Sequence, residues 1–188
     1  MRIITYQAKE VIDILLKEGS YKVTDSKMMK TYNSFKWRND DFNPFKEAYD
    51  YIINRMKKLI DNIDLDDDII APIWGWYKYK SINKLNKDNP DLYRIELEID
   101  EKKVLLSDFY IYEDIAVGGL SYIFEGDDDM VEKYLHAEDE VVFKFYDKML
   151  NLDKAEYIQA TFWKLKIENV KSIKKVSDLK TYIYKKKK

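Results

Sequence analysis

The spacing of apolar positions in the first third of the chain predicts one strand followed by two helices. Residues 2–6 contain consecutive β-branched side chains, which favour a strand. Apolar residues then recur at helical spacing up to residues 17–19, where Gly19 is typical of a helix end. Between a short extended segment at 21–24 and the next helix, residues 25–44 are predicted to form a loop. The second helix covers residues 44–60, with an apolar stripe of Phe45, Tyr49, Ile52, Ile53, Met56 and Ile60.

Three later segments alternate between apolar and polar residues and are predicted strands. They are residues 69–80, 92–100 and 156–168. In the first, strict alternation places Ile73, Gly75, Tyr77 and Tyr79 on one face and Trp74, Trp76 and Lys78 on the other. In the last, it places Tyr157, Gln159, Thr161, Trp163, Leu165 and Ile167 on one face.

The same pattern predicts further helices and short strands. A helix over 109–117 begins after Ser107-Asp108 and stops at Gly118-Gly119. Another starts near Met130 after a run of aspartates, and a third covers 138–150. Residues 104–106, 170–176 and 179–184 read as short strands.

This order of elements predicts the α+β class. Strands grouped near the two ends of the chain do not form a regular βαβ series. We expect one domain over residues 1–184, with a mixed, mainly antiparallel sheet and three to five helices. Residues 185–188 form a basic tail.

Composition excludes several classes of protein and site. The 188 residues are 46% hydrophobic and carry a net charge of −2, as in a globular domain rather than a disordered or strongly basic one. Without cysteine there is no disulfide, thiolate metal site or cysteine nucleophile. The N-terminus lacks the apolar core of a signal peptide, and no long segment is free of charge. We therefore expect a cytoplasmic protein without membrane association, and the excess of lysine over arginine suggests a bacterial source.

Familiar catalytic motifs are missing from the sequence. Gly118-Gly119 lacks the lysine and hydroxyl of a phosphate-binding loop. The single histidine, His136, is expected at the surface or at a helix end. Asp64, Asp66, Asp67 and Asp68 lie in an acidic stretch that lacks the glycine and distal glutamate of a calcium loop, so we expect a surface loop and no metal site. Glu96 and Glu98 share a strand face, either as an outward polar surface or as a carboxylate pair.

Three segments combine aromatic residues with uncharged polar ones. They are Thr5-Tyr6-Gln7, Trp74-Gly75-Trp76-Tyr77 and residues 157–163, which include Gln159 and Thr161. Polar groups within apolar strands need hydrogen-bond partners, and a ligand is one such partner. Trp74 and Trp76 share a face, and Gly75 is expected to leave the opposite face open between Ile73 and Tyr77. This segment could therefore stack a nucleobase or nicotinamide. The alternative is an aromatic core in which the amide of Gln159 bonds to the backbone.

The same segments carry a resemblance to known families. RIITYQAKEVIDILLKEGSY, PIWGWYKY, VLLSDF and IQATFWKLKIENVKSI resemble the bacterial and phage domain-of-unknown-function family numbered 3841. More distantly, the order of first strand, helix, glycine and late strand resembles ADP-ribosyltransferases that modify nucleic acid. Ile3 stands where those enzymes have histidine, and Thr161 stands where they have the catalytic glutamate.

The transferase resemblance implies roles for particular residues. Gln159 and Gln7 would be catalytic, with Tyr6 or Gln7 on the nicotinamide ribose and Gln159 orienting the acceptor or the other ribose. Thr5, Tyr6, Trp74, Trp76 and Thr161 would bind the substrate. A neutral glutamine cannot act as a general base, which indicates a weakened, altered or lost activity.

Two classes of function follow from this reading. The first is an ADP-ribosyltransferase-like enzyme that uses NAD as co-substrate and modifies a nucleic acid or protein. The second is a non-catalytic module that binds a nucleotide or a protein. Lysines over residues 172–188 are either a solvated end or a weak phosphate contact. Both classes require Tyr6, Gln7, Trp76 and Gln159 to line one cleft.

Overall fold

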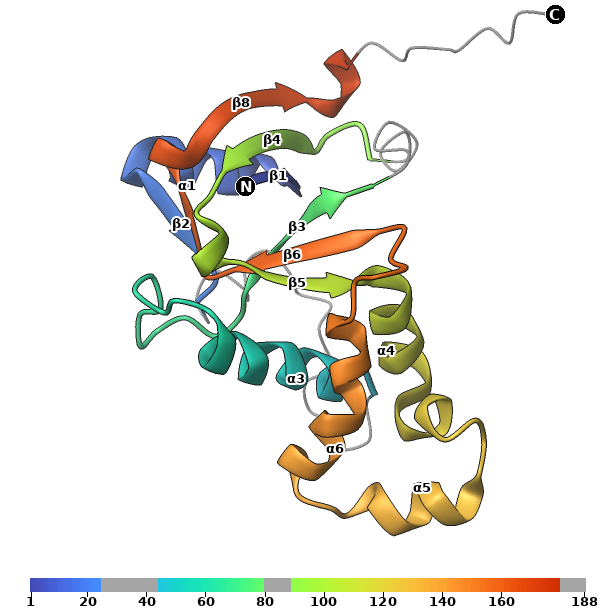
Figure 1. Ribbon diagram of the computed structural model, residues 1–188. Coiled ribbons are helices and arrows are strands. Elements are labelled where there is room, and N and C mark those ends of the chain that lie inside the picture. The colour runs from blue at the N-terminus through green and yellow to red at the C-terminus, as the bar shows by residue number, and fades with distance from the viewer. Residues whose placement is uncertain (25–43, 80–88, 180–188) are drawn as a thin grey trace, which may run out of the picture.

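A six-stranded antiparallel sheet in the order β5-β6-β3-β1-β4-β8 forms the centre of the molecule (Figure 1). The computed structural model describes residues 1–24, 44–79 and 89–179. Strands from both ends of the chain lie side by side in this sheet, which confirms the predicted α+β class. They are β1 (Arg2–Gln7), β3 (Ile73–Lys78), β4 (Tyr93–Glu98), β5 (Leu105–Asp108), β6 (Ile158–Phe162) and β8 (Val170–Lys175).

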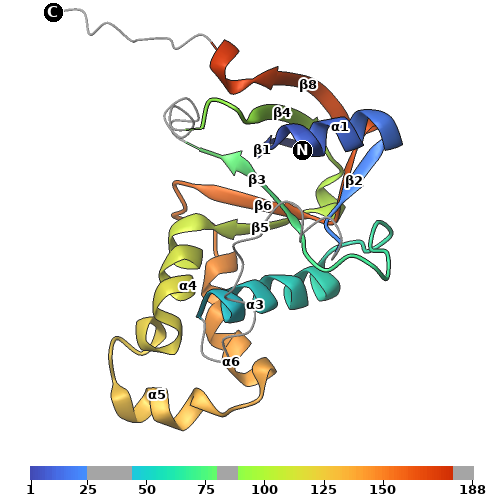
Figure 2. The same ribbon diagram turned by 180° about the vertical axis from the view of Figure 1, so that it is seen from behind.

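One side of the sheet, here called the α1 side, packs against helix α1 (Lys9–Glu18). Figure 2 brings this helix to the front, across β1 and β4. The helix ends as predicted at Gly19, whose φ of 76° lies in the left-handed region. The core on this side contains Ile3, Val11, Ile12, Leu15, Ile95, Leu97 and Phe162.

The opposite side, here called the α4 side, packs at its β5 end against a group of helices (Figure 1). Leu105 of β5 and the partly buried Trp74 of β3 join Ile115 and Tyr146 in this second core. With α1, the described residues form five α-helices, within the range predicted. The helices of this group are α3 (Pro44–Leu59), α4 (Phe109–Ile123), α5 (Asp128–Leu135) and α6 (Asp139–Tyr146).

Helix α4 is longer than the sequence predicts. Its first turn is capped as expected, with the Asp108 carboxylate accepting from the Tyr110 backbone N–H at 2.9 Å. The predicted stop at Gly118-Gly119 is confirmed as a break in the helix, because the regular helix is interrupted at Gly119 and a second helical segment then continues to Ile123. Gly119 takes φ 51° and ψ −133°, a non-helical conformation open to glycine, so it ends the first helical segment and kinks the chain.

The predicted strand over 156–168 is in fact two strands. Strand β6 ends at Phe162, and β7 (Lys164–Lys166) pairs with β2 (Ser20–Lys22) in a separate two-stranded sheet. Trp163 lies at the break, in the core of the α4 side, and its indole N–H donates to Asn62 Oδ1 at 2.8 Å. Leu165 enters the core of the α1 side. The single face predicted for these two residues is therefore wrong.

The acidic stretch after α3 is held against the small sheet by lysines. Asp66 accepts from Lys22 at 2.6 Å and from Lys164 at 2.9 Å. Asp64 accepts from Lys166 at 2.6 Å and from Lys103 at 3.2 Å. These contacts account for Asp64 and Asp66 as ion-pair partners in a surface loop. We call the group the lysine clamp: Lys22, Asp64, Asp66, Lys103, Lys164 and Lys166.

A second charged network joins α3 to Asp147, the residue that follows α6. The guanidinium of Arg55 is buried and binds the Asp147 carboxylate through Nε at 2.7 Å and Nη2 at 3.2 Å. The Tyr51 hydroxyl donates to the same carboxylate at 2.9 Å. Bidentate pairing satisfies a cation that burial would otherwise make costly.

The remaining described elements are short. They are the 3₁₀ turns η2 (Glu101–Lys103), η3 (Asp147–Leu150), η4 (Ile167–Asn169) and η5 (Val176–Asp178). The predicted loop over 25–43, residues 80–88 of the polar connection, residues 180–184 of the last predicted strand and the tail at 185–188 lie outside the described residues.

Candidate functional site

The two threonines predicted to bind substrate are fully buried within the sheet. The Thr5 hydroxyl donates to the backbone oxygen of Trp74 at 2.6 Å. The Thr161 hydroxyl donates to the backbone oxygen of Leu105 at 3.2 Å. Each hydroxyl therefore has its partner on a neighbouring strand, which is how buried polar groups are usually satisfied.

The two predicted catalytic glutamines lie on opposite sides of the sheet. Thr5 pairs with Ile95, a residue of the α1-side core, and Gln7 follows two positions later on the same side. Gln159 pairs with Ser107 and Trp76, and Thr161, two positions further along β6, pairs with Leu105 of the α4-side core. The amide nitrogen of Gln7 donates to the Thr5 hydroxyl at 2.7 Å. The expected cleft shared by Gln7 and Gln159 is therefore wrong.

Tyr6 faces the α4 side, because it lies between Thr5 and Gln7 in the strand and pairs with Arg94 of β4. It therefore shares its side of the sheet with Trp76 and Gln159. Of the four residues expected in one cleft, the fold places three on the same side and separates the fourth.

The tryptophan pair does not form a single open platform. Both residues face the α4 side, as predicted, but Trp74 is packed between Tyr49 of α3 and Tyr112 of α4, at ring-centroid distances of 5.7 and 5.0 Å. On the other side of the strand, Gly75 was expected to leave open space. Ile3 fills it, since a Cβ on Gly75 would come within 2.6 Å of Ile3 Cγ2.

Trp76 belongs to a closed cycle of five aromatic side chains, here called the five-ring cluster. The ring centroids are 4.7 Å apart for Trp76–Tyr79 and Tyr79–Tyr157, 5.1 Å for Tyr157–Tyr110, 5.6 Å for Tyr110–Phe109 and 5.1 Å for Phe109–Trp76. Three segments meet here, namely the end of β3, the junction of β5 with α4, and the start of β6. The cluster reaches the surface through Tyr110, which is 49% exposed.

A β-bulge creates this arrangement. Trp76 pairs with Gln159 and Lys78 with Ile158, so Tyr77 is the extra residue in β3. The bulge interrupts the alternation and brings Tyr79 next to Trp76, whereas strict alternation had placed them on opposite faces. The predicted face of Tyr79 is therefore wrong.

Gln159 lies beside the five-ring cluster and is 7% exposed. It is the cross-strand neighbour of Trp76, and its Oε1 accepts from the Ser107 hydroxyl at 3.4 Å. Among the residues that the structure describes, none accepts a hydrogen bond from its amide nitrogen. A buried donor without an acceptor costs free energy, so this amide is suited to a ligand that supplies one.

The hydroxyls of Tyr79 and Tyr110 remain neutral near pH 7. Burial and the neighbouring Tyr157 raise the pKa of Tyr79 and of Tyr110 above the usual value. The cluster therefore offers neutral rings and hydroxyl groups to a ligand.

Other candidate groups have structural partners. Glu96 binds Arg2 and Arg94, Glu98 binds Lys171, and these cations lower the pKa of both carboxyls. This is the outward polar surface that the sequence allowed as one reading of Glu96 and Glu98. His136 is exposed and ends α5, as predicted. In the described ranges, no three His, Asp or Glu side chains are grouped so as to hold a metal ion.

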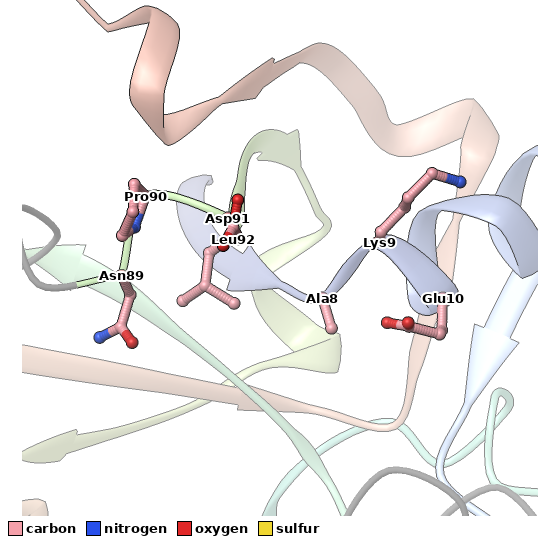
Figure 3. Close-up of a pocket in the computed structure, with 7 residues that line it drawn as sticks. All are labelled: Ala8, Lys9, Glu10, Asn89, Pro90, Asp91 and Leu92. Carbon is pink, nitrogen blue, oxygen red and sulfur yellow. The ribbon is translucent and has the colours of Figure 1, made fainter.

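A pocket of about 310 Å³ lies at the opposite end of the strands, where β1 leads into α1 (Figure 3). Ala8 and Glu10 line it on one side and Pro90 and Leu92 on the other. Lys9 directs its ammonium away from Leu92 and toward Asp13, at 2.6 Å. None of the sequence-predicted site residues lines this pocket.

Sequence reasoning missed Ser107, Phe109, Tyr110 and the place of Tyr79. Phe109 and Tyr110 were assigned only to the start of a helix, and Ser107 only to its cap. The repeated aromatic residues were a visible signal, but their meeting depends on the bulge and on strand pairing.

The comparisons with known proteins agree with the sequence resemblance at the level of the family. Residues 2–146 match the family described as a domain of unknown function, DUF3841, and the chain belongs to this family. No curated protein and no solved structure matches the chain. No described helix combines the length and apolar character needed to cross a bilayer.

Proposed function

We propose that this protein is a nucleotide-binding module, and that the planar ring of the nucleotide packs against the five-ring cluster beside Gln159. The observation that carries the proposal is this closed group of aromatic rings, open to solvent at Tyr110, next to a buried amide that has a donor to spare.

The aromatic rings and the Gln159 amide would contact different parts of a nucleotide base. Aromatic side chains bind flat rings by stacking and edge contacts, worth about 1–3 kcal/mol per base. The Gln159 amide nitrogen can donate to a carbonyl oxygen or ring nitrogen at the edge of such a ligand. A few polar groups within an aromatic surface are characteristic of small-molecule sites.

The geometry supports binding better than group transfer. ADP-ribosyl transfer breaks the bond between nicotinamide and ribose, forms a bond from that ribose to an acceptor and releases nicotinamide and a proton. A carboxylate commonly assists such a step. Asp108, the acid beside Ser107, accepts from the backbone N–H groups of Tyr110 and Ile111 instead.

Calorimetric titration of the full chain with NAD, ATP and GMP tests the proposal. We expect wild type to bind at least one of them, and Tyr110→Ala to weaken that binding about 5- to 100-fold through the loss of one ring contact. Tyr77→Ala is the matched control, because Tyr77 is 47% exposed and lies outside the cluster. No binding of any nucleotide, or equal weakening by the two variants, would overturn the proposal.

Nicotinamide release distinguishes binding from transfer. NAD is incubated with wild type or Gln159→Ala in the presence of mixed nucleic-acid and protein acceptors. Binding without release supports a module. Release by wild type that Gln159→Ala abolishes would instead establish the NAD-dependent transferase with a macromolecular acceptor.

A further inference from the structure

We infer that the free edge of β8 binds an acidic, extended segment of another protein, which adds to the six-stranded sheet as one further strand. Strand β8 lies at the opposite edge of the sheet from β5 and outside the five-ring cluster, so this inference does not depend on the nucleotide site. The edge supplies main-chain hydrogen bonds, and its lysines select the charge of the partner.

The two edges of the sheet differ in how they are covered. At the β5 edge, Leu105, Ser107 and Asp108 are buried, and the strand contacts α3, α4 and η3. Strand β8 pairs with β4 alone, and Figures 1 and 2 show it as the outermost of the described strands. An open edge strand is a template on which another extended chain can pair.

Strand register determines which backbone groups of β8 point outward. The Val176 backbone N–H donates to the Leu92 oxygen at 2.9 Å, so these residues form a hydrogen-bonded pair in the antiparallel register of β8 with β4. Hydrogen-bonded and non-hydrogen-bonded pairs alternate along such strands. Ile173 and Lys175 therefore direct their N–H and C=O groups away from β4, where a further strand would accept from them and donate to them.

The lysines of β8 determine the charge that this edge accepts. Lys171 binds Glu98 at 2.7 Å, and Lys175 binds Asp91 at 3.1 Å. Lys174 is exposed and has no ion-pair partner in the described part of the chain. An antiparallel second copy centred on Ile173 would place Lys171 opposite Lys175, and like charges on facing strands repel. Carboxylates on the facing strand would instead attract, so the edge disfavours self-pairing and favours an acidic segment.

Ile173 adds an apolar requirement to the partner. It is half-buried, pairs with Ile95 and packs against the core of the α1 side. An apolar side chain on the facing strand would cover the part of Ile173 that remains exposed. The expected segment therefore carries acidic residues opposite Lys174 and Lys175 and an apolar residue opposite Ile173.

A peptide with this pattern tests the inference by fluorescence anisotropy with the full chain. The labelled peptide is Thr-Glu-Glu-Val-Thr-Glu, and its charge-reversed control has lysine in place of each glutamate. We expect the acidic peptide to bind at least about tenfold more tightly than the control. No binding of the acidic peptide, or equal binding of the two, would overturn the inference.

Backbone methylation of the peptide distinguishes strand addition from attraction between charges alone. Only alternate amides of an added strand face β8. N-methylation of one alternate set is therefore expected to weaken binding at least about tenfold, and methylation of the other set to leave it unchanged. Equal effects of the two sets would show that the peptide is not paired as a strand.

Two variants of one residue test the outward backbone donor of the protein. Lys175 has a φ of −63°, which proline also adopts. Lys175→Pro removes the N–H and the charge, whereas Lys175→Gln removes the charge alone. We expect the proline variant to bind the acidic peptide at least about threefold more weakly than the glutamine variant, with circular dichroism confirming that both are folded. Equal binding by the two would contradict pairing at this position.

Sedimentation of the full chain without peptide tests a second copy as the occupant. We expect Lys175→Pro to leave the sedimentation coefficient of the chain unchanged. A dimer of wild type that Lys175→Pro dissociates would assign the edge to a second copy and overturn the inference. The nucleotide titrations are independent of these results, so failure at β8 leaves the proposed function standing.

Discussion

The side chains that neighbour a residue in the sheet limit how large that residue can be. Gly75 shows this most clearly, because a Cβ there would lie 2.6 Å from Ile3 Cγ2 and 3.1 Å from the backbone oxygen of Ile4. The absence of a side chain allows β1 and β3 to lie together while Ile3 remains fully buried. This position therefore contributes to packing between strands rather than to an open ligand surface.

Gly75→Ala is expected to lower the free energy of unfolding by about 1–3 kcal/mol, the usual cost of forcing extra volume into a packed core. Urea denaturation followed by circular dichroism measures this change. Ser172→Ala on the edge strand β8 is the control and should change the free energy of unfolding by less than about 0.5 kcal/mol. Equal stability of Gly75→Ala and wild type would show that Ile3 moves aside without cost.

At the residue level, the candidate site was predictable in part. Trp76 and Gln159 were predicted to lie close together. The structure agrees, because the two residues are cross-strand partners in the pairing of β3 with β6. Gln7 could not be placed, because its side of the sheet depends on the register of β1 against β4. Phe109 and Tyr110 follow β5 as a helix start, and nothing local indicates that they meet Tyr157.

Among the elements, the acidic loop depends on partners that are far away in sequence. Asp66 receives hydrogen bonds from Lys22 and Lys164, which lower the pKa of its carboxyl to about 2. Lys166 and Lys103 likewise lower the pKa of Asp64 below its usual value. The lysine clamp therefore attaches the loop after α3 to β2 and β7 only while the aspartates are ionised.

These shifts determine the sign of the pH dependence. A carboxyl whose pKa is lower in the folded state stabilises the fold above its unfolded value near 4, and this contribution is lost as the pH falls toward 2. Asp66→Asn is therefore expected to be less stable than wild type at pH 7 and to show a smaller loss between pH 5 and pH 2.

Thermal unfolding at pH 7, 5, 3 and 2 checks this expectation. Asp67→Asn is the matched control, since Asp67 is the exposed neighbour of Asp66 in the same loop. The control should follow the wild-type pH profile. A profile for Asp66→Asn that runs parallel to that of wild type would show that the clamp does not contribute.

The whole molecule is organised around a sheet with a separate core on each side. The core on the α1 side contains Leu15, and the core on the α4 side contains Ile115, both fully buried. Because β3 and β5 contribute residues to both cores, neither core can lose its packing without disturbing the strands that support the other. Such sharing is the physical basis of a single cooperative transition.

Leu15→Ala and Ile115→Ala should each lower the free energy of unfolding by about 2–5 kcal/mol while preserving one transition. Tryptophan fluorescence reports the α4-side core through Trp163, and far-UV circular dichroism reports the whole chain. Coincident denaturation curves by the two probes are expected for both variants. Separate midpoints in Ile115→Ala would instead show that the helices α3–α6 unfold as an independent unit.

The sequence by itself determined the elements whose signals are local. Helical spacing and a terminal glycine defined α1, and alternation defined β4, since each depends on neighbours a few residues apart. The tertiary structure alone decided the break at Trp163, the bulge at Tyr77 and the side on which each glutamine lies. These features arise from strand register and from competition between two cores, and the strand pairs concerned join residues about 50 to 90 positions apart.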